Sequence, residues 1–218
     1  MSKRTQHTLA LTLTTVVLLA ATLPLIQRIP NGADHYFMID VGETQIVLNN
    51  WGTLHATGYP HYVMIGNLMT APMRGLGLSP LVAAAVVSLL WGIVAAGLLY
   101  ALVHHLTESP AIAAGVTVAV TLTRTVWIHY VIAEIYTFGL AILIGLLALA
   151  LWRVPDEQGY ARIYWLALLG GIGAAHHRAI GMAAPALLFA VWSLLAARPR
   201  AVPRVLGTAL VIGVAGFI

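Results

Sequence analysis

The chain has 218 residues, of which 60% are hydrophobic and only 8% are charged. A soluble domain carries roughly 25% charged residues, so this composition cannot cover a water-exposed surface and indicates a membrane protein. The formal net charge is +4, but no basic run is interleaved with aromatic residues, which argues against nucleic-acid binding. Cysteine is absent, which excludes disulfides, thiolate metal sites and a cysteine nucleophile.

The first apolar segment, at about 8–26, follows a short basic stretch and is long enough to cross a hydrocarbon core of ~30 Å. The small residues at 20–21 leave a cleaved signal peptide as the alternative, although the run is long for a signal core. A polar stretch follows at 27–58. The next stretch, 59–76, is apolar but interrupted by prolines and glycines, which is typical of an interfacial or re-entrant segment.

Further apolar segments fill the rest of the chain, separated by a link at 124–133 and a polar linker at 153–162. They lie at about 81–103, 111–126, 135–152, 163–175, 179–197 and after Arg204. No period-two alternation recurs, so the predicted fold is all-α, a polytopic transmembrane bundle of about six to seven membrane segments. Because the sequence ends inside an apolar run, we expect 1–218 to be the N-terminal part of a longer transmembrane domain.

The charges predict an orientation. If the N-terminus is cytoplasmic and the spans alternate, seven basic residues lie inside and four outside, as the positive-inside rule requires. The inner set is Lys3, Arg4, Arg153, Arg162, Arg198, Arg200 and Arg204, and the outer set is Arg28, Arg74, Arg124 and Arg178. Most acids and the later histidine pair then fall outside: Asp34, Asp40, Glu43, Glu134, His176 and His177. We therefore expect the chemically capable residues to gather at the outer membrane face.

The loop after the first segment carries Asp40 and Glu43 on either side of Gly42. In a helical turn the two carboxylates share one face, and carboxylates serve as general bases, metal ligands or cation sites. A solvated loop acid is the alternative interpretation. Aromatic and histidine side chains follow closely, namely Trp51, His55, Tyr59, His61 and Tyr62. The nearby aromatic and histidine side chains favour a functional loop, which we predict to form the floor of an active site.

Glu134 lies at the mouth of an apolar segment, where a carboxylate is costly unless it faces a polar cavity or a partner. The alternative is an acid at a helix N-terminus, favoured by the helix dipole. Tyr136 also fits the interfacial aromatic belt of membrane proteins.

His176, His177 and Arg178 interrupt an apolar stretch. Adjacent histidines point in different directions on a helix, so they are poor ligands for one metal, and hydrogen bonding to a hydroxyl or phosphate suits them better. Arg178 can hold a phosphate bidentately. A plain turn between two spans is the alternative.

Four motifs carry a resemblance to a known family. They are Asp40-Val-Gly-Glu43-Thr44, His55-Ala-Thr-Gly58-Tyr59-Pro60-His61-Tyr62, Ala133-Glu134-Ile-Tyr136-Thr137 and His176-His177. In this order, over about 40–185, the chain resembles the protein O-mannosyltransferase-like membrane proteins of the GT-C superfamily of glycosyltransferases. It departs from that family's pattern at Val41, at Ala56-Thr57 and at Arg178, where the family has serine, prolines and threonine.

The resemblance implies a GT-C-like fold that moves a mannose-like sugar from a polyprenyl-phosphate donor to a hydroxyl of a protein or glycan acceptor. Asp40 is then the predicted general base, Glu43 or Glu134 orients the acceptor, and the later histidine–arginine cluster stabilises the phosphate leaving group. An in-line displacement inverts the anomeric centre. No cofactor or metal is predicted, although the resemblance leaves room for a divalent ion. The predicted substrate-binding residues are Glu134, Tyr136, His55, Tyr59, His61, His176, His177 and Arg178.

Two other classes of protein stay open. A transporter or channel also uses acids and histidines near membrane spans, but its ionisable groups extend through the membrane depth. A non-catalytic membrane subunit would keep the fold without the chemistry. The identity of the sugar, of the carrier lipid and of the acceptor is not encoded in any motif.

Overall fold

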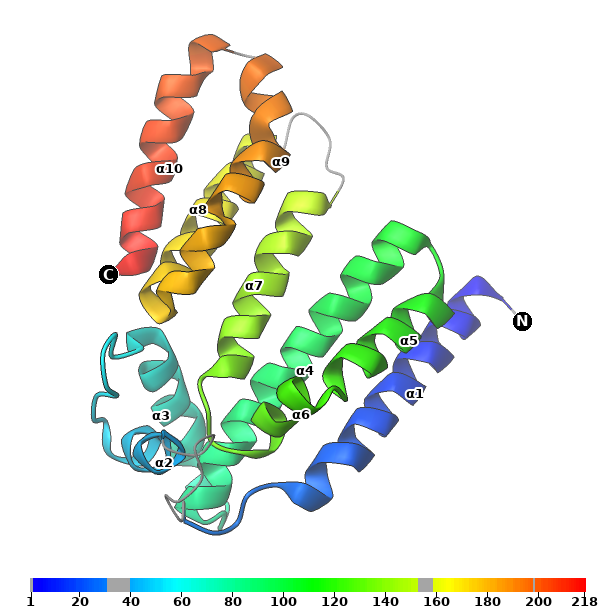
Figure 1. Ribbon diagram of the computed structural model, residues 1–218, viewed down its shortest axis with the longest axis vertical. Helices are drawn as coiled ribbons and strands as arrows, with labels where there is room; N and C mark the ends of the chain where they lie inside the picture. The colour runs from blue at the N-terminus through cyan, green and yellow to red at the C-terminus, as the bar shows by residue number, and fades with distance from the viewer. Residues whose placement is uncertain (1, 31–39, 153–158, 198) are drawn as a thin grey trace.

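The computed structural model describes residues 2–30, 40–152, 159–197 and 199–218, and all regular elements in these ranges are helices (Figure 1). The prediction of an all-α fold is therefore confirmed. The longer helices are α1 (Lys3–Thr22), α2 (Val41–Asn50), α3 (Pro60–Gly75), α4 (Pro80–Thr107), α5 (Pro110–Thr121), α6 (Arg124–Val131), α7 (Tyr136–Leu151), α8 (Gly159–His176), α9 (Ala184–Ala197) and α10 (Val202–Phe217). Short 3-10 turns are η1 (Leu23–Leu25), η4 (Arg178–Ala183) and η5 (Pro199–Ala201). Asp34, Arg153 and Arg198, to which the sequence assigned a membrane side, lie outside the described residues.

Four stretches in the described ranges are long and apolar enough to cross a membrane, namely Lys3–Leu25, Pro80–Thr107, Arg178–Ala197 and Pro199–Phe217. The predicted segment 111–126 is divided between α5 and α6, which bend by 76° and form a fifth span if the pair is taken together. α7 is a shorter apolar helix, and α8 and the predicted interfacial helix α3 are not among the candidates. The chain is thus a multi-pass helical membrane protein.

Serine followed by proline starts both α4 and α5. The Ser79 hydroxyl accepts a hydrogen bond from the Val82 amide, and the Ser109 hydroxyl accepts one from the Ile112 amide, each at 3.3 Å. Such caps satisfy amides that have no partner within the helix, and proline suits the first helical position. These caps fix where the long helix α4 begins and where α5 turns back beside it.

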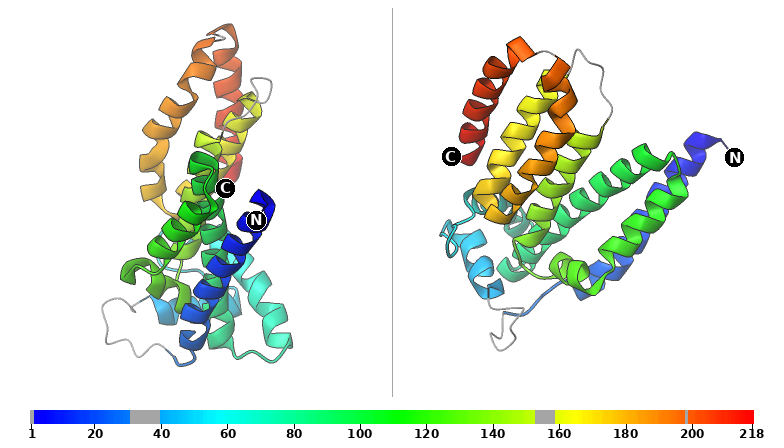
Figure 2. Two further views of the ribbon diagram at one scale, coloured as in Figure 1. Left: turned by 90° about the vertical axis from the view of Figure 1, so that its right-hand side faces the viewer. Right: turned by 45° about the horizontal axis from the view of Figure 1, so that its top comes forward.

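The long helices run back and forth between two ends of the bundle. α1, α4 and α5 pack on one side and α8, α9 and α10 on the other, with α7 between them (Figure 1). α2 and α3 lie at the end where α1 finishes, α4 and α7 begin and α8 finishes, which is called here the α2–α3 end; the two views in Figure 2 show the same arrangement. The opposite end carries the start of α1 and of α8.

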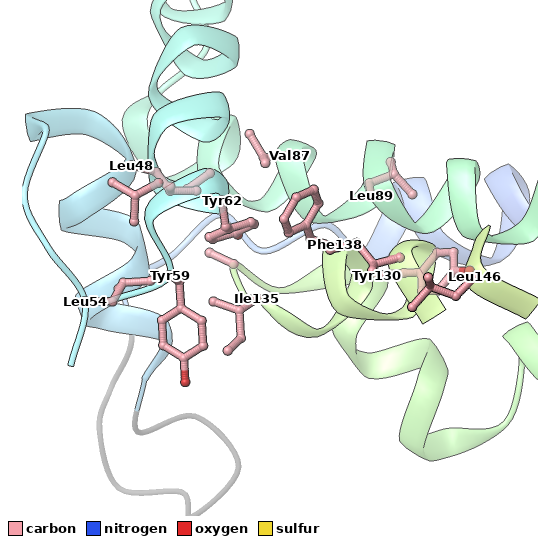
Figure 3. Packing of buried hydrophobic residues seen from close by; sticks show 14 of the residues in the cluster. Leu48, Leu54, Tyr59, Tyr62, Val87, Leu89, Tyr130, Ile135, Phe138 and Leu146 are labelled. Atoms are coloured by element: carbon pink, nitrogen blue, oxygen red, sulfur yellow. The ribbon is translucent and has the colours of Figure 1, made fainter. Parts of the chain in front are cut away.

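The best-buried part of the core lies just beneath α2 and α3. Tyr62 is fully buried between Leu48 and Phe138 (Figure 3). α2 and α3 are also joined through Asn67, which donates to the Val47 carbonyl at 3.0 Å and accepts from the Trp51 amide at 3.1 Å. A buried, fully engaged amide of this kind fixes the relative placement of the two helices. It thereby fixes the acids of α2 relative to the loop that leads into α3.

Candidate active site

An acid–histidine cluster lies at the start of α2. Asp40 is the N-cap residue of α2 but makes no side-chain capping bond, and Glu43 lies in the first helical turn. His55, from the loop between α2 and α3, places its Nδ1 atom 2.7 Å from Glu43 Oε2 and 3.9 Å from Asp40 Oδ1. All three side chains are partly exposed, at 45% for His55, 41% for Asp40 and 35% for Glu43. The cluster is held together but open to solvent.

The acids make His55 more basic than usual. Its pKa is raised chiefly by the hydrogen bond to Glu43; partial burial opposes this shift, and the charges of Asp40, Glu43 and Glu134 add to it. The Tyr59 hydroxyl lies in the same field, because burial and the charges of Asp40, Glu134 and Glu43 raise its pKa while Arg178 lowers it. Residues from three separate stretches of the chain therefore act on one another at the α2–α3 end.

Tyr59 connects this cluster to the end of α8. Its ring centroid is 5.6 Å from that of His55 and 5.4 Å from that of His176. Its backbone has φ +49°, the left-handed region that aromatic residues seldom adopt, directly before Pro60 at the start of α3. Such a conformation persists only where the surroundings hold it and is common at functional sites.

Glu134 is buried beside the cluster, with only 3% of its surface exposed. Its backbone is fixed by Ser88, whose hydroxyl lies 2.9 Å from both the Glu134 amide and the Glu134 carbonyl, and by the Tyr62 hydroxyl, which donates to that carbonyl at 3.1 Å. Its Oε2 atom has no hydrogen-bond partner in the part of the chain that the structure describes. Burial, and then the charge of Asp40, raise the pKa of Glu134 to about 7, partly offset by a backbone hydrogen bond and by His55. A buried carboxyl of this kind exchanges its proton near neutral pH.

His176 ends α8 and is 1% exposed. Its Nε2 atom is 3.2 Å from the Ile135 carbonyl, so Nε2 carries the proton and donates it, which leaves the partnerless Nδ1 as an acceptor. Its ring also contacts Phe138, with centroids 4.9 Å apart. His176 thus ties α8 to the start of α7, and its free nitrogen is not a donor in the neutral form.

The residues after His176 form a turn between α8 and α9, which was the alternative interpretation of this polar stretch. His177 precedes η4, and its Nδ1 accepts from the Ala179 amide at 3.2 Å. Arg178 begins η4 and is exposed. Since its positive charge acts on Tyr59, Arg178 lies on the same side of the molecule as the acids.

An apolar groove of about 900 Å³ runs along α4, α7 and α8. His61 and Phe138 line it at the α2–α3 end, and Trp152 and Arg162 line it at the opposite end. The His61 Nδ1 atom is buried without a hydrogen-bond partner. Because Phe138 also packs on His176, the groove reaches the polar residues at the α2–α3 end.

Tyr136 is a half-exposed residue among the predicted site residues. It is 47% exposed, and its ring packs on His129 with centroids 4.5 Å apart. This position suits the interfacial aromatic belt. Conversely, sequence reasoning overlooked Ser88, the hydroxyl that holds the Glu134 backbone. Its signal was a lone serine nine residues into the apolar helix α4, where a hydroxyl needs a partner on another segment.

A multi-pass helical bundle with carboxylates, histidines and an apolar groove meeting at one end defines a membrane protein with a candidate active site at the membrane edge. Residues 40–199 match the family described as the Protein O-mannosyl-transferase TMEM260 N-terminal domain, and the chain belongs to that family. The matched range begins at Asp40 and includes all the predicted site residues. The family description supports a glycosyltransferase with a sugar donor and a protein acceptor, in agreement with the resemblance predicted from the motifs. No curated protein and no solved structure matches the chain.

Proposed function

We propose that this protein transfers a mannose-like sugar from a polyprenyl-phosphate donor to a hydroxyl of a protein acceptor, at the outer membrane face. The observation that carries the proposal is the meeting of Asp40, Glu43, His55 and Glu134 at the end of the bundle that the apolar groove reaches. A lipid-linked donor requires two features together, carboxylates that can act on the acceptor and an apolar groove that can hold the lipid chain.

Asp40 is the proposed general base. Glu43 is engaged with His55 at 2.7 Å, whereas the nearest His55 nitrogen is 3.9 Å from Asp40 and no helix amide binds its carboxylate. Asp40 therefore has oxygen atoms free to take the acceptor hydroxyl proton. The acceptor oxygen then bonds to the anomeric carbon, the bond from that carbon to the phosphate oxygen breaks, and its electron pair leaves with the phosphate. Attack opposite the leaving group inverts the anomeric centre.

Glu134 is proposed to position the acceptor, and Arg178 and His61 are proposed to receive the phosphate. Arg178 is the exposed cation on the side of Tyr59, and His61 has an unpaired nitrogen at the mouth of the groove. His176 instead uses its proton on the Ile135 carbonyl, so we assign it a positioning role between α7 and α8. A guanidinium and an imidazole near the departing phosphate stabilise the charge that develops there.

The groove is proposed to hold the polyprenyl chain. Its walls are almost entirely aliphatic and aromatic and include Trp91, Ile142 and Leu169. Its volume of about 900 Å³ lies within the range of ligand sites that bury large apolar molecules. An isoprenoid chain in it would extend from His61 toward Trp152, with the phosphate at the α2–α3 end.

The orientation is proposed from the described charges. Lysine and arginine at the end that carries the N-terminus are Lys3, Arg4, Arg162, Arg200 and Arg204, and those toward the α2–α3 end are Arg28, Arg74, Arg124 and Arg178. This excess supports a cytoplasmic N-terminus and an outer α2–α3 end. A cysteine placed beside Asp40 should react with an impermeant thiol reagent from outside, and reaction only from the cytoplasmic side would refute the orientation.

A transporter would need ionisable groups along the membrane depth. The helices α5, α7 and α9 contain no charged residue and no histidine. Among the described residues of the groove wall, Arg162 is the only lysine, arginine, aspartate or glutamate, and it lies at the far end. This arrangement favours transferase chemistry over an ion path. A non-catalytic subunit, in turn, has no use for a buried, unpaired carboxyl such as Glu134.

The experiment is a donor panel. The full-length protein in nanodiscs is given polyprenyl-phosphate sugars of several kinds, and both transfer to a serine- and threonine-rich acceptor and release of free sugar are counted. We expect turnover with a mannose-type donor and its loss in Asp40→Asn, with helicity and melting temperature unchanged. Turnover with none of the donors, together with no binding of polyprenyl phosphate, would refute the proposal.

A further inference from the structure

We propose that Asp40, Glu43 and His55 form a binding site for one divalent transition-metal ion, of which Mn²⁺ is the representative. Each of these three residues offers one ligand atom, and these atoms all lie within 4.8 Å of one another. An octahedral ion with ligands at ~2.1 Å needs neighbouring ligand atoms ~3 Å apart and opposite ones ~4.2 Å apart. The distances from His55 Nδ1, 2.7 Å to Glu43 Oε2 and 3.9 Å to Asp40 Oδ1, are close to those that such an ion needs, so a small adjustment of one helix turn and one facing loop would complete the site.

A second observation points to a cation. The Glu134 carboxylate is buried beside the cluster, and its Oε2 has no hydrogen-bond partner among the described residues. The charge of Asp40 acts on Glu134, and the charge of Glu134 acts on His55. A carboxylate buried without a partner is unfavourable, and three carboxylates gathered together are more so. Glu134 is not one of the converging ligands, but a water on the ion could donate to its free oxygen. Buried carboxylates that hold metal-bound water in this way are common beside metal sites.

The donor set indicates the kind of ion. Two carboxylates and one imidazole suit Mn²⁺ or Zn²⁺, whereas Mg²⁺ and Ca²⁺ prefer oxygen ligands alone. The three side chains are partly exposed, so the remaining coordination positions face solvent. Water or a phosphate oxygen can fill them.

Binding of the ion does not depend on the proposed function, but the role of the ion in sugar transfer rests on that function. An ion bound through Asp40 Oδ1 leaves Oδ2 free to accept a proton, so the two roles of Asp40 are compatible. A phosphate oxygen in an open position would be held close to the anomeric carbon, and the ion would neutralise the charge that the leaving group gains.

The test measures Mn²⁺ binding directly. Full-length protein in nanodiscs of zwitterionic lipid is stripped with EDTA at pH 7.5, titrated with Mn²⁺ and followed by electron paramagnetic resonance. We expect one saturable Mn²⁺ per protein with a nitrogen coupling from an imidazole. Glu43→Gln and His55→Gln should weaken binding at least tenfold, and Glu134→Gln should weaken it less, as outer partners of metals do. The exposed acid at the opposite end supplies the control, Glu108→Gln, which should bind normally.

Absence of saturable binding up to millimolar Mn²⁺ would overturn the inference. So would binding that neither Glu43→Gln nor His55→Gln weakens, because the ion would then lie elsewhere. A nitrogen coupling that persists in a folded His55→Gln protein would do the same. Saturable binding at the cluster without sugar transfer from any donor would retain the metal site and refute the proposed function. Transfer that proceeds fully in EDTA, without Mn²⁺ binding, would retain the function and refute the site.

Discussion

Burial of Glu134 makes the stability of the fold depend on pH in a way that one substitution removes. The carboxyl has a pKa of about 7 in the folded protein against 4.5 for an ordinary glutamate. Below pH 4.5 it is protonated in both the folded and the unfolded chain and has no effect. Between 4.5 and 7 the folded protein binds more protons than the unfolded chain, so the free energy of unfolding falls as pH rises. Above pH 7 the loss is complete.

The expected loss in the free energy of unfolding follows from the difference between the folded and unfolded pKa values of Glu134. At about 1.4 kcal/mol for each tenfold change in proton affinity, the loss amounts to about 3 kcal/mol. Glu134→Gln keeps the shape and has no proton to lose, so relative to the wild type it should gain that amount between pH 4.5 and pH 8. For a chain of this size, 1 kcal/mol corresponds to about 2–4 °C in melting temperature. The melting difference between variant and wild type should therefore grow by about 6–12 °C.

The assay is tryptophan fluorescence during heating of protein in nanodiscs, from pH 4.5 to 8, in the presence of EDTA so that no cation pairs with Glu134. Glu108→Gln is the matched control, because Glu108 is exposed at the other end of the bundle. Its melting difference from the wild type should not change with pH. A Glu134→Gln curve parallel to the wild type over the whole range would refute the claim that this carboxyl is buried and unpaired.

Three further substitutions test the packing, the groove and the support of the site. A Cβ atom on Gly171 would clash with the Gly213 carbonyl oxygen of α10, whereas one on Gly170 has no described atom within 4 Å, so Gly171→Ala should lower the melting temperature and Gly170→Ala should not. Ala148 lines the apolar groove and its neighbour Leu147 is 37% exposed outside it, so Ala148→Trp should raise KM for long-chain donors more than for short ones while Leu147→Trp leaves both unchanged. Ser88→Ala removes the hydroxyl that is hydrogen-bonded to the Glu134 backbone, so kcat should fall in a protein that remains folded. An unchanged kcat would show that this hydroxyl does not support the site.

Composition and local chain signals predicted the helical membrane fold, because they depend on no distant contact. Continuous apolar runs indicated the spans. The break at His176–Arg178 was likewise visible as polarity within an apolar stretch. The predicted link at 124–133 placed a break after the apolar segment 111–126, but neither the 76° bend nor helix α6 was predicted, because both depend on contacts with other helices.

Only part of the candidate site could be predicted from the sequence, because some of its contacts join segments that are distant in the chain. Asp40 and Glu43 stand close in sequence, so their shared face follows from helical geometry. The 2.7 Å contact of Glu43 with His55 depends on the path of a loop that no periodicity describes. The burial of Glu134 depends on Ser88 and Tyr62, which come from other helices. Sequence patterns of a single chain do not predict contacts between segments that are distant in sequence.

The most direct test of Asp40 as the base separates binding from chemistry. The full-length protein is saturated with polyprenyl-phosphate mannose, an excess of acceptor is added, and a single turnover is followed in the wild type and in Asp40→Asn. We predict donor affinities within twofold of each other and a transfer rate lower by about 10²–10⁴ in the variant, as for loss of a general base. Equal rates in the two proteins would contradict it and would place the base on another residue.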